Sequence, residues 1–341
     1  MRLPKETVDR LRPAFDAKTV CVTGGCGFIG GHLCDALHSL GAAVRVIDDC
    51  SSSSSEHVCS LIDLDPERLR FVRASILDPQ GLAEAVRGSD AVFHLAAIGS
   101  VPRSIEDPAR SWAVNATGTL RVLEAARAFG VRRVVYSASS SAYGESETLP
   151  KVESMPADPV SPYAASKLAG EELCRVWSRC YGLSTACLRY FNVFGPRQPA
   201  GSAYAAVIPA VLEKLGKGQS PVIHGDGEQT RDFTPVANAV LANLLAASST
   251  TPLTGEAMNV GLGVRVSINQ LVRRLASMMD AEGLEPVHAD SRAGDVRHSL
   301  ADLSRAGELI GYAPVTGFDE GLAETVEWAR GGAVNNLGGS R

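Results

Sequence analysis

The sequence predicts an α/β protein, a doubly wound parallel sheet followed by a smaller mixed α/β domain. Short apolar runs alternate with helical patterns from residue 18 to about 190, and parallel βαβ units produce this order. After residue 191 the alternation loosens and loops rich in glycine and proline appear. We therefore predict one domain at 18–190 and a second mainly at 191–330, some segments of which can return to the first sheet.

The first βα unit carries three glycines at Gly24, Gly27 and Gly30, between an apolar strand at 18–23 and a helix. The strand after that helix, at 43–47, ends at Asp48. This order is the dinucleotide-binding unit of the Rossmann fold: the glycines let the backbone approach a pyrophosphate, and the carboxylate accepts the ribose hydroxyls.

The residues after Asp48 favour NAD over NADP. They are Asp49, Cys50 and a serine run at 51–55, with no arginine to pair a 2′-phosphate. The serine run could equally be a connecting loop without a further role.

Strands and helices continue in alternation along the rest of the chain. We predict strands at 69–73, 91–97, 133–137, 184–190 and 222–224, and helices at 79–88, 106–129, 162–181, 204–216, 236–247, 267–280 and 317–330. Ligands of such sheets bind at the carboxyl ends of the strands. The serines at 137–141 lie at one of these ends, where catalytic groups belong.

The flanking segments and the composition narrow the class of protein. Residues 1–17 are a polar leader, predicted as a short surface helix, and 331–341 a glycine-rich tail, predicted as disordered. A net charge of −5 without a basic run argues against nucleic-acid binding, and no apolar stretch or signal peptide points to a membrane. Eight cysteines without CxxC spacing indicate neither zinc nor disulfides. We expect a cytoplasmic protein without a metal.

Tyr163 and Lys167 are candidate catalytic residues. They lie four residues apart after Pro162, which suits the start of a helix, so both side chains share one face. An ammonium group beside a phenol lowers the phenol pKa from about 10 towards neutrality, which would make the tyrosine a base, and a nearby serine can share its proton. The alternative is an ordinary helix in which the tyrosine packs and the lysine is solvated.

Several longer segments extend the pattern, and together they resemble the extended short-chain dehydrogenase/reductase family. The resemblance covers about 18–330 and is most specific to its nucleotide-sugar 4-epimerases, above all those acting on UDP-N-acetylglucosamine. The matching segments are TGGCGFIGGH at 23–32, HLAAIGSVPRSIEDP at 94–108, NATGTLRVLEAA at 115–126, YSASSSAYG at 136–144, SPYAASK at 161–167, RYFNVFGPRQ at 189–198, HGDGEQTRDFT at 224–234 and RAGDVRHSLADLS at 292–304.

The resemblance implies a reaction and a set of residues. Tyr163 would take the proton of the sugar 4-hydroxyl, Lys167 would hold the nicotinamide ribose, and Ser139 would bridge to the 4-oxygen, while hydride leaves C4 to NAD and returns to the other face. Implied cofactor-binding residues are Gly24, Gly27, Phe28, Ile29, Gly30, Asp48, Asp49, Ser75, Ile76, Leu95, Ala96, Ala97, Asn115, Ser137, Tyr163, Lys167 and Tyr190. Implied residues for a UDP-sugar are Ser100, Ser139, Ser140, Ser141, Asn192, Ala206, Val207, Val222, Ile223, Arg231, Arg292, Asp295 and Ser299.

Two of the implied contacts also follow from chemistry. Arg231 and Arg292 can neutralise a diphosphate through bidentate hydrogen bonds, and Asp295 can bind ribose hydroxyls. The alternative for each arginine is a surface salt bridge. The resemblance further implies a homodimer through the helices at 106–129 and 162–181, both with apolar positions at helical spacing.

The chain departs from the family pattern at two places. Ser75 replaces an aspartate that meets the adenine, and Ala237-Asn238 replaces an acidic pair, which we expect to alter surface or helix-start contacts. His94 and His298 have no evident metal partner and are predicted to be structural.

The size of two residues bears on the sugar. In the resembling family the positions that match Ser299 and Ala206 face the sugar, and both residues are small here. The resemblance therefore implies room for an acetamido group and predicts turnover of UDP-GlcNAc and UDP-GalNAc, with some activity on UDP-glucose and UDP-galactose. UDP-glucose or UDP-glucuronate epimerases and other NAD-dependent oxidoreductases remain alternatives. A 4,6-dehydratase is disfavoured because Ser140-Ser141 stand where that family has Asp-Glu. A non-catalytic nucleotide-binding protein fits the complete Ser139, Tyr163 and Lys167 set least.

Overall fold

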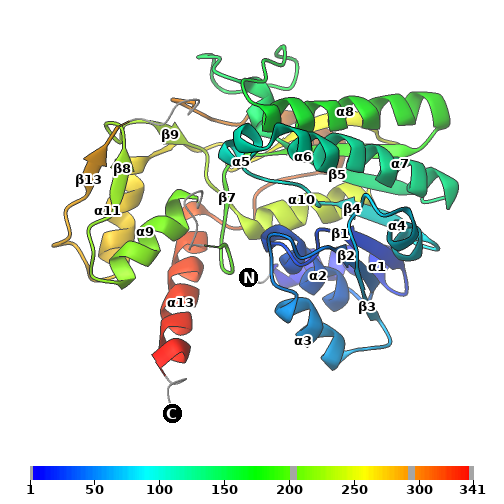
Figure 1. Cartoon of the computed structure of the whole chain (residues 1–341), viewed down its shortest axis with the longest axis horizontal. Coiled ribbons are helices and arrows are strands. Elements are labelled where there is room, and N and C mark those ends of the chain that lie inside the picture. The colour runs from blue at the N-terminus through cyan, green and yellow to red at the C-terminus, as the bar shows by residue number, and fades with distance from the viewer. Residues whose placement is uncertain (1–2, 200–205, 291–295, 338–341) are drawn as a thin grey trace.

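A computed structural model describes residues 3–199, 206–290 and 296–337 (Figure 1). Its centre is a seven-stranded sheet in the order β11-β6-β5-β4-β1-β2-β3, and every neighbouring pair is parallel. This confirms the doubly wound fold class. The strands are β1 (Thr19–Thr23), β2 (Ala43–Asp48), β3 (Leu69–Arg73), β4 (Ala91–His94), β5 (Arg133–Ser139), β6 (Ser184–Tyr190) and β11 (Thr254–Val260).

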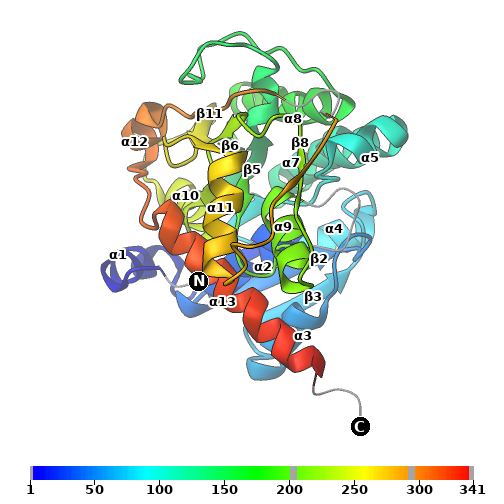
Figure 2. The same cartoon turned by 90° about the vertical axis from the view of Figure 1, so that its left-hand side faces the viewer.

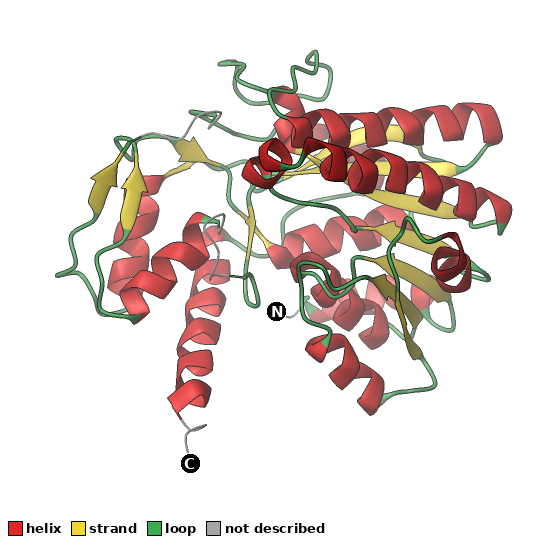
Figure 3. Ribbon diagram, in the orientation of Figure 1, coloured by secondary structure: helices red, strands yellow, loops and turns green. Residues whose placement is uncertain are grey.

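Helices cover both faces of this sheet, as Figure 3 shows by colour. Two apolar layers result, because the buried strands are Val-, Ile- and Leu-rich on both faces. One layer contains α1 (Lys5–Phe15), α2 (Phe28–Ser39), α3 (Glu56–Leu64), α10 (Val236–Ser248) and α12 (Ser304–Ile310). The other contains α4 (Pro79–Val86), α7 (Gly118–Ala128) and α8 (Pro162–Tyr181).

The second domain lies beside the carboxyl ends of the central strands, on the left of Figure 1 and facing the viewer in Figure 2. It has its own apolar core. Its helices are α9 (Val207–Gly216), α11 (Ile268–Met278) and α13 (Phe318–Leu337). Short strand pairs join it together: β7 (Val193–Phe194) with β10 (Thr234–Pro235), β9 (Thr230–Arg231) with β12 (Val266–Ser267), and β8 (Val222–His224) with β13 (Val287–Ala289).

Several local expectations were wrong. The leader helix is not merely on the surface, since Leu11 and Phe15 are 3% exposed and belong to the core beneath the sheet. The tail is helical as far as Leu337, so the prediction of disorder fails for 331–337. The helix expected at 106–129 is divided, with a π-helical turn inside it: α5 (Val101–Glu106), α6 (Pro108–Trp112), the turn Ala113–Thr117, and α7.

Asn238 also differs from the expectation of a surface contact. It is fully buried at the start of α10, where its Oδ1 accepts hydrogen bonds from the N–H groups of Val315 and Thr316 and its Nδ2 donates to the Thr316 carbonyl. The contact at the start of α10 is therefore a buried one, and it connects α10 to the segment before α13.

None of the helices within the described ranges is both long enough and apolar enough to cross a membrane.

Candidate functional site

The largest of three neighbouring cavities that hold the predicted residues lies at the carboxyl ends of β1, β5 and β6. It measures about 620 Å³ and opens between the central sheet and the second domain. The predicted residues on its wall are Gly24, Gly27, Phe28, Ile29, Gly30, Leu95, Ala97, Ser137, Ser139, Ser140, Ser141, Tyr163, Lys167, Tyr190, Asn192, Arg231 and Ser299. The sheet thus brings together residues up to 275 positions apart (299 − 24).

Two further cavities adjoin it through shared residues. One of about 460 Å³ is lined by Gly24, Gly27, Asp48, Asp49, Ser75, Ile76, Leu95, Ala96 and Ala97. The other, of about 410 Å³, lies in the second domain and is lined by Asn192, Ala206, Val207, Val222, Ile223 and Arg231.

Two glycines of the turn leave no room for a side chain. A Cβ on Gly24, where φ is +72°, would lie 2.6 Å from the Ala96 nitrogen, and one on Gly30 would lie 2.2 Å from the Gly24 carbonyl oxygen. α2 begins directly after Gly27, so its first N–H groups, which have no partner inside the helix, face the cavity. This is the cradle that a dinucleotide pyrophosphate requires.

Asp48 is held in place at the end of β2. Its Oδ2 accepts a hydrogen bond from the Cys26 N–H at 3.0 Å, and its Oδ1 accepts one from the Cys50 N–H at 2.8 Å. Burial raises the pKa of Asp48, and these two bonds oppose the shift. Each oxygen keeps a second lone pair, so the carboxylate fits the adenosine ribose of NAD.

The helix α8 begins at Pro162, as expected, with the Ser161 hydroxyl accepting a hydrogen bond from the Ala164 N–H at its start. Tyr163 and Lys167 project from its first turns into the cavity. The Lys167 ammonium donates to the Ser137 carbonyl at 2.7 Å. Burial lowers the pKa of Lys167 to about 8, although Glu171 one turn further opposes the shift.

Tyr163 corrects one part of the sequence argument. Its pKa is raised because the phenol is buried, and a hydrogen bond with Ser139 is what opposes the rise. Lys167 is not among the groups that shift the pKa of Tyr163 in the protein alone. Ser139 lies at the end of β5 and also accepts from the Ser141 hydroxyl at 2.9 Å, so a short relay of hydroxyl groups reaches the tyrosine.

Two of the described site residues, Asn115 and Ser100, are not on these walls. Asn115 is 1% exposed and instead bonds the backbone of Ile98, with Nδ2 also donating to Ser166, so it fixes the loop after β4 against α8. Ser100 caps α5 from the position before the helix, where its hydroxyl accepts a hydrogen bond from the Arg103 N–H at 3.4 Å. Arg292 and Asp295 lie outside the described residues.

The two histidines that we predict to be structural form hydrogen bonds with threonine hydroxyl groups. His94 is 1% exposed between Thr23 and Thr119, and burial lowers its pKa to about 3. His298 hydrogen-bonds Thr230.

Sequence reasoning missed other residues on the walls. Ser52 and Ser53 of the serine run line both the cavity of about 620 Å³ and the cavity of about 460 Å³ that contains Asp48. Arg103 and Arg110 line the second of these cavities. Lys151 and Gln198 line the largest. The position of the serine run after Asp48 could have suggested its role, but no local signal marks Lys151, which reaches the wall because its backbone pairs with Ala301.

A network of charged side chains fixes the loop before residue 200 to the cofactor helix. Arg197, with φ of +65°, donates to Asp35 at 2.6 Å and hydrogen-bonds His32 and His57. Burial lowers the pKa of His32 to about 4. The network holds the neighbouring Gln198 at the junction of two cavities.

Several known proteins are similar to this chain in sequence and in fold. The model of the NAD dependent epimerase/dehydratase family matches residues 20–261. The UDP-glucose 4-epimerase of Mycolicibacterium smegmatis is 40% identical over 313 residues, which cover 91% of this chain and 97% of that protein.

Solved structures agree in fold. The UDP-N-acetylglucosamine 4-epimerase from Methanobrevibacter ruminantium, in complex with UDP-N-acetylmuramic acid, has a TM-score of 0.87 at 39% identity, covering 93% of this chain and 99% of that one. The UDP-glucose 4-epimerase of Thermotoga maritima with UDP-glucose has a TM-score of 0.85 at 36% identity, covering 92% and 99%. The chain is an enzyme with NAD as its cofactor, and it belongs to the NAD-dependent epimerase/dehydratase family.

Proposed function

We propose that this enzyme is an NAD-dependent 4-epimerase of UDP-hexoses. The observation that carries the proposal is the meeting of Ser139, Tyr163 and Lys167 on one wall of the cavity that the glycine turn also lines. The names of the similar proteins support the same reaction.

The residues take the following roles in the proposed reaction. Bound NAD supplies a hydride acceptor and donor. Tyr163 takes the proton of the sugar 4-hydroxyl as base and returns it as acid, and Ser139, which is bonded to Tyr163, bridges to the 4-oxygen. Lys167 is held by the Ser137 carbonyl and orients the nicotinamide ribose. Between the two proton transfers the sugar presents its other face, which the room in the cavity permits.

Replacing Tyr163 by phenylalanine tests the role of the base. The variant should fold and retain NAD but lose at least about 100-fold in epimerisation rate, because general acid–base catalysis contributes about that much or more. Tyr181→Phe, at an exposed tyrosine at the other end of α8, is the control and should keep the wild-type rate. Retention of more than about a tenth of the wild-type rate by Tyr163→Phe would contradict the assignment.

The uridine diphosphate is assigned to the second-domain cavity and its junction with the catalytic one. Asn192 and Arg231 line both, and a guanidinium suits a diphosphate. Arg292 and Asp295, which lie outside the described residues, complete this set in the proposal.

We propose N-acetylated hexoses as substrates because the residue sizes favour them. Ser299 lines the catalytic cavity, and its hydroxyl accepts from the Asp232 N–H at 3.4 Å. A tyrosine at this position would occupy space that an acetamido group needs. Ala206 is also small, but it lines the neighbouring cavity.

The substrate assignment is tested with UDP-GlcNAc, UDP-GalNAc, UDP-glucose and UDP-galactose, with the epimers resolved by NMR. Wild-type enzyme should turn over the N-acetylated pair, and Ser299→Tyr should abolish that activity and spare the other. Ser299→Ala is the matched control and should keep both. Turnover of UDP-glucose without UDP-GlcNAc by wild-type enzyme would reject the size argument.

Lys151 favours a second candidate, the UDP-glucuronate 4-epimerase. Its side chain is 1% exposed on the wall of the catalytic cavity, and its ammonium donates to the Ser146 carbonyl. None of the ion pairs between described residues contains Lys151, and burial lowers its pKa. A carboxylate on the sugar would supply the missing charge. Adding UDP-glucuronate to the panel, with Lys151→Met as the variant, decides between the two.

We also propose a cytoplasmic homodimer. The eight cysteines are free, which suits a reducing compartment. α7 and α8 lie side by side (Figure 1), and the large side chains of Trp112 in α6 and of Val176 and Tyr181 in α8 are 42–52% exposed. Light scattering at micromolar concentration should give twice the chain mass of 35.8 kDa, and a monomer mass would reject the dimer.

A further inference from the structure

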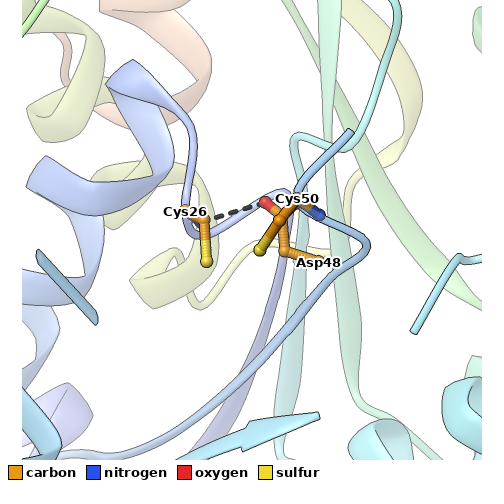
Figure 4. Close-up of side chains that lie close together, drawn as sticks. All are labelled: Cys26, Asp48 and Cys50. Carbon is orange, nitrogen blue, oxygen red and sulfur yellow. Dashed lines mark hydrogen bonds between the residues drawn. The ribbon is translucent and has the colours of Figure 1, made fainter. Parts of the chain in front are cut away.

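Three potential metal ligands meet beside the expected ribose position. The Sγ atoms of Cys26 and Cys50 and a carboxylate oxygen of Asp48 all lie within 4.8 Å of one another. Figure 4 shows the two sulfurs on the same side of the carboxylate. Across the part of the chain that the structure describes, these are the His, Cys, Asp and Glu side chains that converge in this way.

The backbone on both sides of the cluster is held in position. Cys26 belongs to the glycine turn before α2, and Cys50 follows the end of β2 with φ of +56°. The N–H groups of the two cysteines bind the two oxygens of Asp48. A ligating carboxylate is commonly oriented by such hydrogen bonds, so Asp48 is oriented before a cation arrives.

The ligand types select the cation. Thiolates are soft ligands that favour zinc and similar thiophilic ions over magnesium or calcium. On one tetrahedral zinc ion with Zn–S near 2.3 Å and Zn–O near 2.1 Å, the ligand atoms are separated by about 3.5–4 Å. The cluster needs only small side-chain movements to reach that spacing. All three residues are partly exposed, so water can complete the coordination.

We propose that Cys26, Asp48 and Cys50 form a site for a thiophilic divalent cation, and that this cation competes with NAD. Three protein ligands and an open position suit a reversible ion better than a structural one, since structural zinc sites have four protein ligands. Asp48 lines the cavity assigned to the adenosine half of NAD. A carboxylate engaged by a cation is no longer free to accept the ribose hydroxyls, so each ligand weakens the binding of the other.

Cobalt is the probe, because thiolate-bound Co²⁺ gives an intense near-ultraviolet charge-transfer band. Wild-type protein freed of NAD should bind one Co²⁺ per chain with this band, and Zn²⁺ should abolish it by displacing the cobalt. NAD should also abolish the band. Saturating Zn²⁺ should raise the NAD concentration needed for half-saturation, and by linkage NAD weakens Zn²⁺ by the same factor.

Cys50→Ser removes one ligand and retains the backbone N–H, and Cys59→Ser is the matched control at an exposed cysteine outside the cluster. The first should bind Co²⁺ at least about tenfold more weakly with a reduced band, and the second should match wild type. Circular dichroism checks that both are folded. The site is refuted if wild type shows no band, if Cys50→Ser keeps the full wild-type band and affinity, if Cys59→Ser loses as much of the band as Cys50→Ser, or if NAD leaves the band unchanged. These readouts do not depend on epimerase activity, so a failed epimerase assay leaves them standing.

Discussion

Replacing Lys167 by methionine is expected to stabilise the NAD-free protein at neutral pH while removing its proposed catalysis. The ammonium is buried, and its pKa falls from the ordinary 10.5 to about 8. This pKa difference lowers the free energy of unfolding by about 3 kcal/mol while the lysine is protonated. Methionine fills similar volume without a charge.

One loss offsets part of this gain. The Ser137 carbonyl, which accepts from the Lys167 ammonium at 2.7 Å, would lose its donor at a cost of about 1 kcal/mol. The net gain at pH 7 is therefore about 2 kcal/mol, measured as the free energy of unfolding in urea titrations of the NAD-free protein. Lys217→Met is the control, because that lysine lies in an exposed ion pair with Glu213 and should change stability by less than about 0.5 kcal/mol.

The pH dependence makes the test sharper. Below pH 8 both the folded and the unfolded protein hold the Lys167 proton, so the wild type carries the full penalty. Between the folded pKa of about 8 and the unfolded value of about 10.4, the unfolded state binds more protons, so wild-type stability rises with pH relative to the variant. By about pH 10.5 the gap should have closed and reversed to about 1 kcal/mol in favour of the wild type, because the variant still lacks the hydrogen bond to the Ser137 carbonyl. A variant less stable than wild type at pH 7, or a gap that does not change with pH, would refute the reasoning.

Two further substitutions probe the cofactor turn and the buried ion pair. Gly30→Ala should weaken NAD binding at least about tenfold, because its Cβ would lie 2.2 Å from the Gly24 carbonyl oxygen. The control Gly31→Ala should bind NAD as wild type does, because the nearest atom to its Cβ is a His57 side-chain carbon at 3.4 Å. Equal affinities of the two variants in an equilibrium titration would contradict this reasoning. Arg189→Met should lower the free energy of unfolding by about 3–5 kcal/mol, because Glu171, which is paired with Arg189 at 2.7 Å and is 6% exposed, would be left charged and buried. Adding Glu171→Leu should restore most of the lost stability. A double variant as unstable as Arg189→Met would argue against an unpaired charge as the cause.

The sequence by itself determined the elements whose signals are local. α8 and β6 begin and end where predicted, at 162–181 and 184–190, because Pro162 marks the start of α8 and the left-handed Gly182 separates it from β6. The glycine turn and Asp48 were equally readable, since backbone crowding and a carboxylate after a strand are fixed by residue type at a given spacing. The helical spacing predicted that Tyr163 and Lys167 share one face, whereas their expected roles came from the family resemblance.

Only the tertiary structure decided what depends on distant partners. β11 joins the main sheet by pairing with β6, and Lys151 reaches the catalytic cavity by pairing with Ala301. No residue pattern near either segment predicts these pairings. The pKa of Tyr163 rises where spacing to Lys167 suggested a fall, because burial depends on everything packed around the phenol. Cys26 and Cys50 lack any metal-binding spacing, yet the parallel register of β1 and β2 brings their turns together. Spacing along the chain fixes the contacts within one element, whereas packing fixes solvation and every contact between elements.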